Sequence, residues 1–555
     1  MALFPPEFIA AVLFAFVQVR LRSVVSVAAF LTNGLTFFLP PEDELIHKLN
    51  GGPPPPPVAK GAKAAPKPQP TPLSSEEKMR AFFINVAKTE TGVFQQTLFY
   101  ELYEMMVILA TSTLVACASS DVLNYYFAWA VAPESGDSVA TGKAEISVYG
   151  LVSVLMVCLW FPLQVQLAQG IASYESRLGL SVGALGFILS LYSIFAPKPL
   201  VDFDLERAIA LTGTRLEIVF RAIGFVDGDL ENLAPAAATM RISSFAAVAF
   251  LCGLFTATSF LPAFRFARIY AEMVRDKSTS LLKKLLLHLN VILPLLCGIC
   301  WIRPLATDLV VPSYLIRCSP RWHSVRLAIV ALAIVVRVAC FHDHLQFFLV
   351  EPKDAIVQLV RRPGRVDGEL LKSKIRLQFN YAPIIAIQYL APVGALLAVL
   401  VLLARQTVTS LGVFDAVAFV LMKAGVVAPE RTLQWFTARP VLPSDAAPDV
   451  GGFRIGDDVN SESLKKFVQG MSDFSVVTPE AHASLLGFLI WWFTFAWFMM
   501  TVAGLVYWKN VPHGISTTGL TDPLESMANR EQLRRNRETP KLLKNQLKGL
   551  KMKRH

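Results

Sequence analysis

Residues 326–346 read RLAIVALAIVVRVACFHDHLQ, an apolar run of membrane-spanning length with Arg337 near its middle and His344 and Gln346 at its end. Hydrocarbon cannot solvate a guanidinium, and placing one at the centre of a membrane helix costs about 2.5–3.5 kcal/mol on insertion scales. We therefore expect Arg337 to face protein or water, with polar groups of other segments around it.

The whole chain shares the apolar character of this stretch. Of its 555 residues, 54% are hydrophobic and only 17% are charged, and the mean hydropathy is +0.48. This composition is typical of an all-α, polytopic helical membrane protein. Eight apolar runs of about 20 residues predict the strong spans: 102–122, 148–167, 178–195, 243–264, 286–305, 327–348, 382–403 and 485–507.

Residues 1–39 form a hydrophobic N-terminal segment. Phe8–Val19 is apolar and precedes Arg20, while residues 1–7 carry no Lys or Arg. A cleaved signal peptide needs a basic stretch before its apolar core, so we expect an uncleaved anchor. The next apolar piece, Val24–Leu39, is short and interrupted by Asn33 and Gly34, which favours a re-entrant or interfacial segment.

Composition divides the rest of the chain. Residues 40–99 are predicted to be a linker region, because Gly51–Pro72 contains nine prolines and little that a core could bury. The helical bundle occupies 100–508, with a long polar loop at 404–484. Within the bundle region, 202–225 carries apolar residues at helical spacing among charges, which predicts an interfacial helix. Residues 411–422 are too short to span and are a candidate re-entrant segment.

The distribution of Lys and Arg predicts the orientation. One alternate set of segments carries 32 of these residues and the opposite set of loops carries 16. The richer side is expected to face the cytosol, which makes the linker and the tail at 509–555 cytosolic. The richer set consists of 40–99, 168–177, 265–285, 349–381 and 509–555.

The basic tail also bears on localisation. Lys551 and Lys553 stand five and three positions from the C-terminus, the arrangement of a dilysine signal for retrieval to the endoplasmic reticulum. The alternative is plain contact between a basic tail and lipid headgroups. We expect an integral protein of the endomembrane system, with the endoplasmic reticulum favoured, or of the plasma membrane.

The net charge of +10 does not indicate nucleic acid as a partner, because residues 509–555 alone hold 11 Lys/Arg against four Asp/Glu. The expected partners are the lipid bilayer and other membrane proteins.

No signature of nucleotide binding, zinc proteolysis or serine hydrolysis stands in a suitable context, so we expect no enzyme and no cofactor. His342 and His344 lie two apart and do not share a helix face, and Cys297 and Cys300 sit in an apolar run. No metal site is therefore predicted.

Several polar residues inside the spans are candidates for an intramembrane network. Pro294 and Pro392 each free a carbonyl one turn earlier, near Asn290 and Gln388, where polar groups or water could dock. The alternative is that these polar residues only form structural hydrogen bonds between packed helices. The candidate network comprises Arg337, His288, Asn290, His344, Gln346 and Gln388, with Glu101 and Glu104 as charge partners.

Several short blocks in 243–507 resemble the transmembrane protein 161 family. They are Leu261–Ala267 (LPAFRFA); Leu286–Asn290 (LLHLN) with Pro294, Leu295, Trp301, Pro304 and Asp308; Arg337 with His344–Gln346; Gln388 and Tyr389 with Ala391 and Pro392; and Trp491–Trp492. Each block is weak alone, but their order is specific as a set. The resemblance implies a multi-pass protein without established catalytic activity, whose animal relatives are associated with membrane excitability, cardiac rhythm and stress resistance.

The leading hypothesis is therefore a non-enzymatic membrane protein that modulates ion handling through partner proteins. The alternative is an ion conduit or secondary transporter with a polar path around Arg337, His288 and Gln388. A third hypothesis, a membrane-embedded enzyme acting on lipid, depends on His288, His342 and His344.

Overall fold

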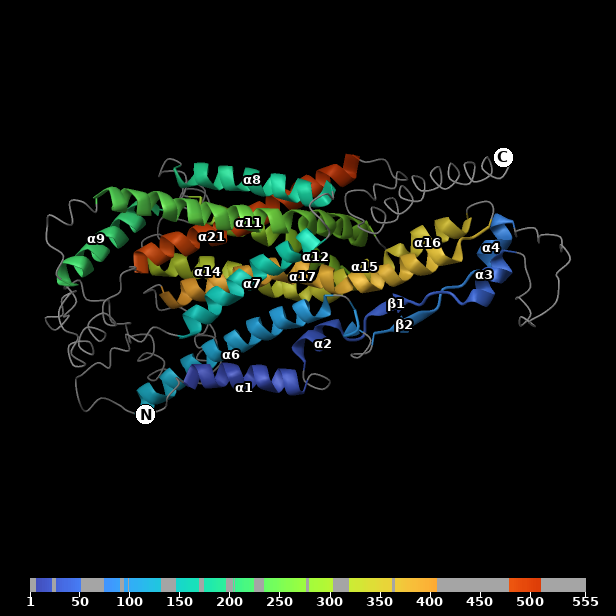
Figure 1. The fold of residues 1–555 in the computed structure, drawn as a ribbon, viewed down its shortest axis with the longest axis horizontal. Helices are drawn as coiled ribbons and strands as arrows, with labels where there is room; N and C mark the ends of the chain where they lie inside the picture. Colours follow the sequence, from blue (N-terminus) through green and yellow to red (C-terminus); the bar gives the residue numbers. More distant parts are fainter. Residues whose placement is uncertain are drawn as a thin grey trace, which may run out of the picture.

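The computed structural model of the chain is a bundle of long helices that lie side by side along its longest axis (Figure 1). In the part of the chain that the structure describes, eight helices are long and apolar enough to cross a membrane. The described residues are 6–21, 26–50, 74–89, 94–97, 99–130, 146–168, 174–195, 203, 205–223, 234–275, 279–302, 319–361, 365–406 and 479–510.

The eight predicted spans are confirmed as helices. They are α6 (Tyr100–Ala130), α7 (Ile146–Ala168), α8 (Tyr174–Ile194), α11 (Ala234–Arg275), α12 (Leu281–Ile299), α14 (Ser319–Ala339) continued by α15 (Phe341–Val350), α17 (Gly368–Gln406) and α21 (Pro479–Asn510). Many helix boundaries differ from the predictions; α17, for example, begins at Gly368, 14 residues before the predicted start at 382. α11 continues 11 residues beyond the predicted end at 264, and α12 begins five residues before 286 and ends at Ile299.

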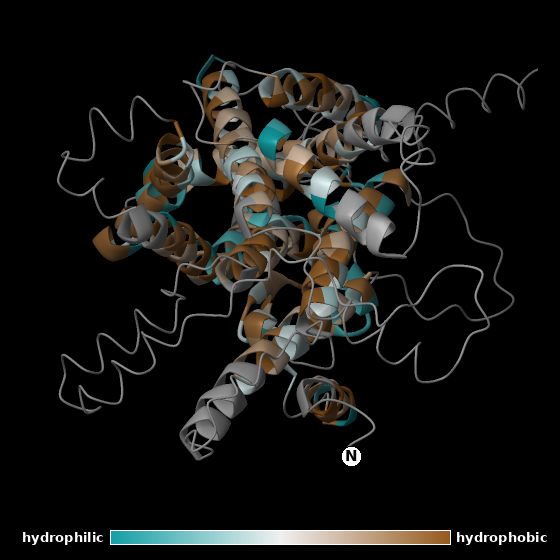
Figure 2. Cartoon of the chain, turned by 90° about the vertical axis from the view of Figure 1, so that its left-hand side faces the viewer, coloured by the Kyte–Doolittle hydropathy of each residue, from teal (hydrophilic) through white to brown (hydrophobic). Residues whose placement is uncertain are grey.

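The outer surface of the bundle is apolar, as a lipid-facing surface must be. Large hydrophobic side chains such as Leu185 and Ile188 on α8 and Leu332 and Val335 on α14 are exposed. A view along the bundle shows brown, hydrophobic residues on helix faces that point outward (Figure 2). The chain is thus an integral membrane protein in contact with the bilayer.

The N-terminal segment joins the bundle. α1 (Pro6–Arg20) lies alongside α6 (Figure 1), and Gln18 donates to the Thr111 hydroxyl at 2.8 Å. α2 (Val27–Thr32) also lies against α6, where the Tyr103 hydroxyl donates to the Ala28 carbonyl at 3.1 Å. Val24–Leu39, expected to be a re-entrant or interfacial piece, therefore contains a short helix and then a strand.

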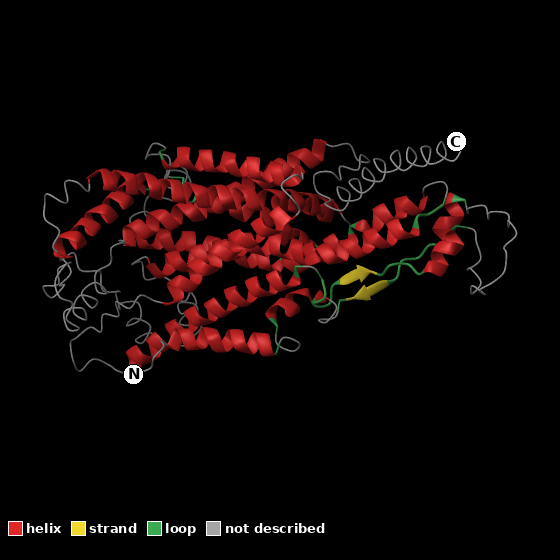
Figure 3. Cartoon of the chain, in the orientation of Figure 1, coloured by secondary structure: helices red, strands yellow, loops and turns green. Residues whose placement is uncertain are grey.

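One end of the bundle carries a small folded extension that the linker prediction for 40–99 did not include. β1 (Thr36–Phe38) pairs antiparallel with β2 (Val86–Lys88), although some 50 residues separate them, and both strands lie beside the helices at this end of the molecule (Figure 3). α3 (Asp43–Leu49), α4 (Ser75–Ala81) and α16 (Pro352–Arg361) complete the extension. A second apolar core, separate from that of the bundle, includes Leu49, Ile356 and Leu371.

The predicted interfacial helix is present as α9 (Leu205–Ile223) at the opposite end of the bundle (Figure 1). Leu205 and Ala208 on one of its faces are buried, and Phe203 just before it contacts Phe488 and Trp491 of α21.

Trp491 and Trp492, two neighbouring aromatic residues in the last predicted span, lie inside the protein. Both side chains are buried between helices, and the Trp492 indole donates to the Cys252 carbonyl and the Thr256 hydroxyl, each at 3.2 Å. Polar atoms of α11 thus satisfy the Trp492 N–H, whereas Nε1 of Trp491 is buried without a hydrogen-bond partner among the described residues.

Several predicted segments lie outside the described residues: Gly51–Pro72, most of the loop 404–484 with Leu411–Met422, and the tail beyond Asn510 with Lys551 and Lys553.

Candidate functional site: a buried arginine cluster

Arg337 lies on the inner face of α14. Val330, Ala333 and Ile334 precede it at helical spacing and are buried, whereas Leu332 and Val335 between them are exposed. Arg337 therefore points into the bundle with its residue only 8% exposed, as the cost of exposing a guanidinium to hydrocarbon requires.

Aromatic rings cover the guanidinium. Its carbon lies 3.5 Å from the ring centroid of Trp497 on α21 and 5.3 Å from that of Tyr389 on α17. The faces of both rings are electron-rich, and such a contact contributes about 2 kcal/mol when water is excluded. Three helices, α14, α17 and α21, thus meet at one cation.

Tyr389 links this contact to the backbone and to a fourth helix. Its hydroxyl donates to the Arg337 carbonyl at 3.0 Å and accepts from the Asn290 amide of α12 at 3.2 Å. The His344 ring of α15 lies over Tyr389, with ring centroids 4.5 Å apart. Asn290, His344 and Arg337, proposed from sequence as members of one network, are thus gathered around a tyrosine that was part of a family block but not a member of the predicted network.

A second buried arginine belongs to the same region. Arg265 of α11 donates to the side-chain oxygen of Gln388, the residue before Tyr389, and is 7% exposed. The predicted span ends at residue 264, which leaves Arg265 in a loop. The signal that could have shown otherwise is the continued helical spacing of Phe266, Ile269 and Met273, all buried.

No carboxylate of the part of the chain that the structure describes pairs with either arginine. Within the described residues neither Arg265 nor Arg337 forms an ion pair, and Nε of Arg265 and Nε and Nη2 of Arg337 are buried without a hydrogen-bond partner. Glu101 is exposed, and Glu104 is buried near Tyr103 of its own helix. Neither acts as the charge partner expected from sequence.

A cavity adjoins Arg337. Its volume of about 20 Å³ holds one water molecule and little more, since about 10–15 Å³ of this measure is needed for one. Asn290, Arg337 and Thr494 contribute polar groups, Pro294 and Pro392 lie beside them, and the remaining wall is apolar.

Two candidates from the sequence lie elsewhere. The His288 side chain is on an exposed face of α12, with its Nδ1 atom 2.8 Å from the Tyr270 hydroxyl. Gln346 binds β1: it accepts from the Thr36 backbone N–H at 2.8 Å and donates to the Thr36 hydroxyl at 2.8 Å. Gln346 therefore joins the folded extension to the bundle.

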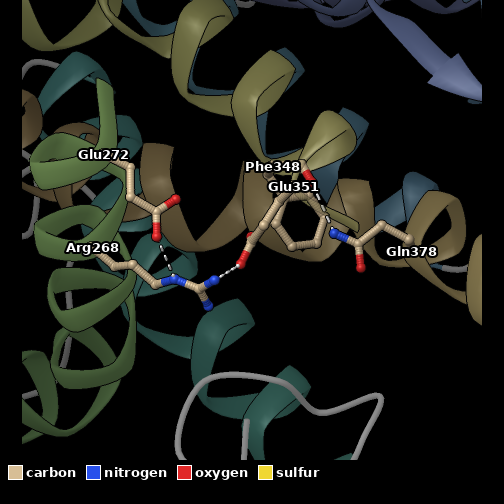
Figure 4. Close-up of polar contacts among 5 residues, drawn as sticks. All are labelled: Arg268, Glu272, Phe348, Glu351 and Gln378. Carbon is tan, nitrogen blue, oxygen red and sulfur yellow. Dashed lines mark hydrogen bonds and ion pairs between the residues drawn. The ribbon is translucent and has the colours of Figure 1, made fainter. Parts of the chain in front are cut away.

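A separate polar cluster lies at the end of the bundle that carries the extension (Figure 4). Arg268 of α11 pairs with Glu351, next to α15, at 2.6 Å and with Glu272 at 3.1 Å. Nearby, Gln378 of α17 donates to the Phe348 carbonyl at 2.8 Å. Unlike Arg265 and Arg337, this arginine has carboxylates at hand.

The histidine and cysteine pairs form no shared site. His342 is exposed and His344 is buried, while Asp343 between them pairs with Lys283 at 2.7 Å. Cys297 and Cys300 are buried free thiols. The described residues contain no group of three or more His, Cys, Asp or Glu that could hold a metal ion.

The profile of one protein family, described as "Predicted transmembrane protein 161AB", matches residues 2–511. The chain belongs to the transmembrane protein 161 family. No solved structure matches it. In this member of the transmembrane protein 161 family, the blocks that carried the resemblance supply the buried cluster: Arg265, Asn290, Arg337, His344, Gln388 and Tyr389 all stand in them.

Proposed function

We propose that this member of the transmembrane protein 161 family is a non-enzymatic membrane protein that modulates ion handling, and with it membrane excitability, through partner membrane proteins. The closed packing around Arg337 is the observation that carries the proposal. Trp497 and Tyr389 lie against the guanidinium, and the adjoining cavity holds little more than one water molecule. A polar centre packed in this way offers a hydrated ion no passage.

The positions of the other candidates favour the same proposal over a conduit. His288 lies on an exposed face of α12 and Gln388 is bound by Arg265. Together with Arg337 they do not line one path. The lipid-enzyme hypothesis loses support in a similar way, since His288 and His342 are exposed on the bundle surface and His344 is buried under Tyr389.

The folded extension is the surface that we propose for partners. It projects beyond the bundle (Figure 1) and is fixed to it by Gln346 and by the hydrogen bonds of Asn50 to Val366. By the excess of Lys and Arg in the segments at this end, we propose that it faces the cytosol together with the C-terminus. Retrieval to the endoplasmic reticulum through Lys551 and Lys553 is part of the same proposal.

Ion flux through the purified protein in liposomes tests the proposal directly. We expect no flux of common cations or chloride from wild type or from Arg337→Gln. Flux in wild type that disappears in Arg337→Gln would make the protein a conduit and overturn the proposal.

The modulatory role itself needs a cellular measurement. Cells that express the protein should show a changed amplitude of an existing conductance, with an unchanged reversal potential, because the permeating pore belongs to another protein. A variant that loosens the attachment of the extension, Gln346→Leu, should weaken the effect, whereas the matched surface change His342→Gln should keep it. If wild type, Gln346→Leu and His342→Gln change the conductance equally, the extension is not the surface that binds the partner.

A further inference from the structure

We propose that the cavity beside Arg337 is a binding site for one small monovalent anion of about the size of chloride. The inference goes beyond the proposed function, because such a site would occupy the core whether or not the protein acts through partners.

The charge balance of the core is the first argument. Cations near the end of the bundle have carboxylates within reach: Arg268 pairs with Glu351, and Lys283 pairs with Asp343. Arg265 and Arg337, two of the three buried arginines, have none among the described residues. Burying a charge without a counter-charge is costly in a low-dielectric interior, so an anion from solution would stabilise the folded core where the described residues supply no carboxylate.

The geometry of Arg337 is the second argument. Ring faces of Trp497 and Tyr389 cover the guanidinium, but a ring face cannot accept the in-plane hydrogen bonds that Nε and Nη2 offer. These two nitrogens are buried without a partner, and Arg337 lines the cavity. Neighbouring N–H donors of one guanidinium form a fork that binds a single anion from the side.

The size and lining of the cavity define the ligand. A volume of about 20 Å³ admits a monatomic ion but not a sulfate or a carboxylate with its attached carbon chain. Asn290 and Thr494 add polar side chains to the wall beside Arg337. The apolar neighbours Ala333 and Phe493 strengthen the attraction by excluding water.

A water molecule is the competing occupant. Water would accept one hydrogen bond from Arg337, but it is neutral and would leave the charge of the core unbalanced. The difference between the two occupants is measurable, because only an anion gives saturable binding that depends on its concentration.

Equilibrium binding of radiolabelled chloride to the purified full-length protein in detergent tests the site. We expect about one saturable chloride per chain in wild type, displaced by bromide and not by sulfate. Arg337→Gln should weaken binding at least about tenfold, since it removes charge-assisted hydrogen bonds. Ala333→Leu should weaken it similarly by filling the cavity while Arg337 stays in place. Arg268→Gln removes a guanidinium outside the cavity and should bind as wild type does.

Several results of this experiment would overturn the proposal. Absence of saturable binding in wild type means that the cavity holds water only, and the proposal is overturned. Binding that survives both Arg337→Gln and Ala333→Leu, or that sulfate displaces as well as bromide does, also overturns it. If Arg337→Gln does not fold, as judged by gel filtration, Ala333→Leu decides the matter.

Discussion

The guanidinium carbon of Arg337 lies 3.5 Å from the centroid of the Trp497 ring, so the last span of the protein covers the one arginine in the middle of the sixth. The two residues are 160 positions apart in the chain. Their contact makes α21 part of the polar core instead of a peripheral membrane anchor.

Replacing Trp497 should therefore cost more than replacing an exposed tryptophan. Trp497→Leu removes a buried ring and its contact with a cation, and we expect the free energy of unfolding to fall by about 2–4 kcal/mol. Thermal melting in detergent measures the change. The matched control is Trp160→Leu, at a site that is 57% exposed, which should shift melting little. Equal shifts would mean that the contact with Arg337 contributes nothing.

The bond between Arg265 and Gln388 predicts opposite effects for two substitutions at one position. Gln388→Leu leaves the Arg265 guanidinium without its acceptor and should destabilise the fold by about 1–3 kcal/mol. Gln388→Glu keeps the acceptor and adds the carboxylate that this region lacks, so its melting temperature should equal or exceed that of wild type. If Gln388→Glu lowers the melting temperature as much as Gln388→Leu does, the missing carboxylate does not limit the stability of this site.

Close packing between α8 and α11 depends on glycine. A Cβ atom at Gly183 would lie 2.5 Å from the Ala257 Cβ, so we expect Gly183→Ala to lower the melting temperature through overpacking worth about 1–3 kcal/mol. Gly213 of α9 has open space around its would-be Cβ. Gly213→Ala should raise stability by about 0.4–1 kcal/mol. The same sign for both substitutions would contradict the packing assignment.

Gln346 should control the order of the extension without affecting the bundle. Gln346→Leu removes its hydrogen bonds to Thr36, and amide hydrogen exchange in β1 and β2 should become faster while exchange in α11 and α17 stays unchanged. Exchange followed by mass spectrometry measures both regions in one sample. Unchanged protection of Thr36 would show that strand pairing alone holds the hairpin.

The sequence predicts some residues of the site correctly and misses others. Arg337 was placed correctly on the protein side of its helix, because the cost of a charge in lipid is independent of the neighbours. Arg265 was missed as a core residue because the helix boundary was set too early, and Tyr389 and Trp497 were missed because an aromatic residue in an apolar run gives no sign of the cation that it will cover.

The sequence predicts, without tertiary information, the class of protein, the eight strong spans, a helix within 202–225 and the inward direction of Arg337. These follow from composition and helical period, which are local properties of each segment. Other features depend on contacts between distant segments. His288 and Gln346 lie outside the arginine cluster, and Arg265 belongs to it. Two strands about 50 residues apart pair at one end of the bundle. Which helices become neighbours depends on the packing of all faces at once, and no single segment carries that information.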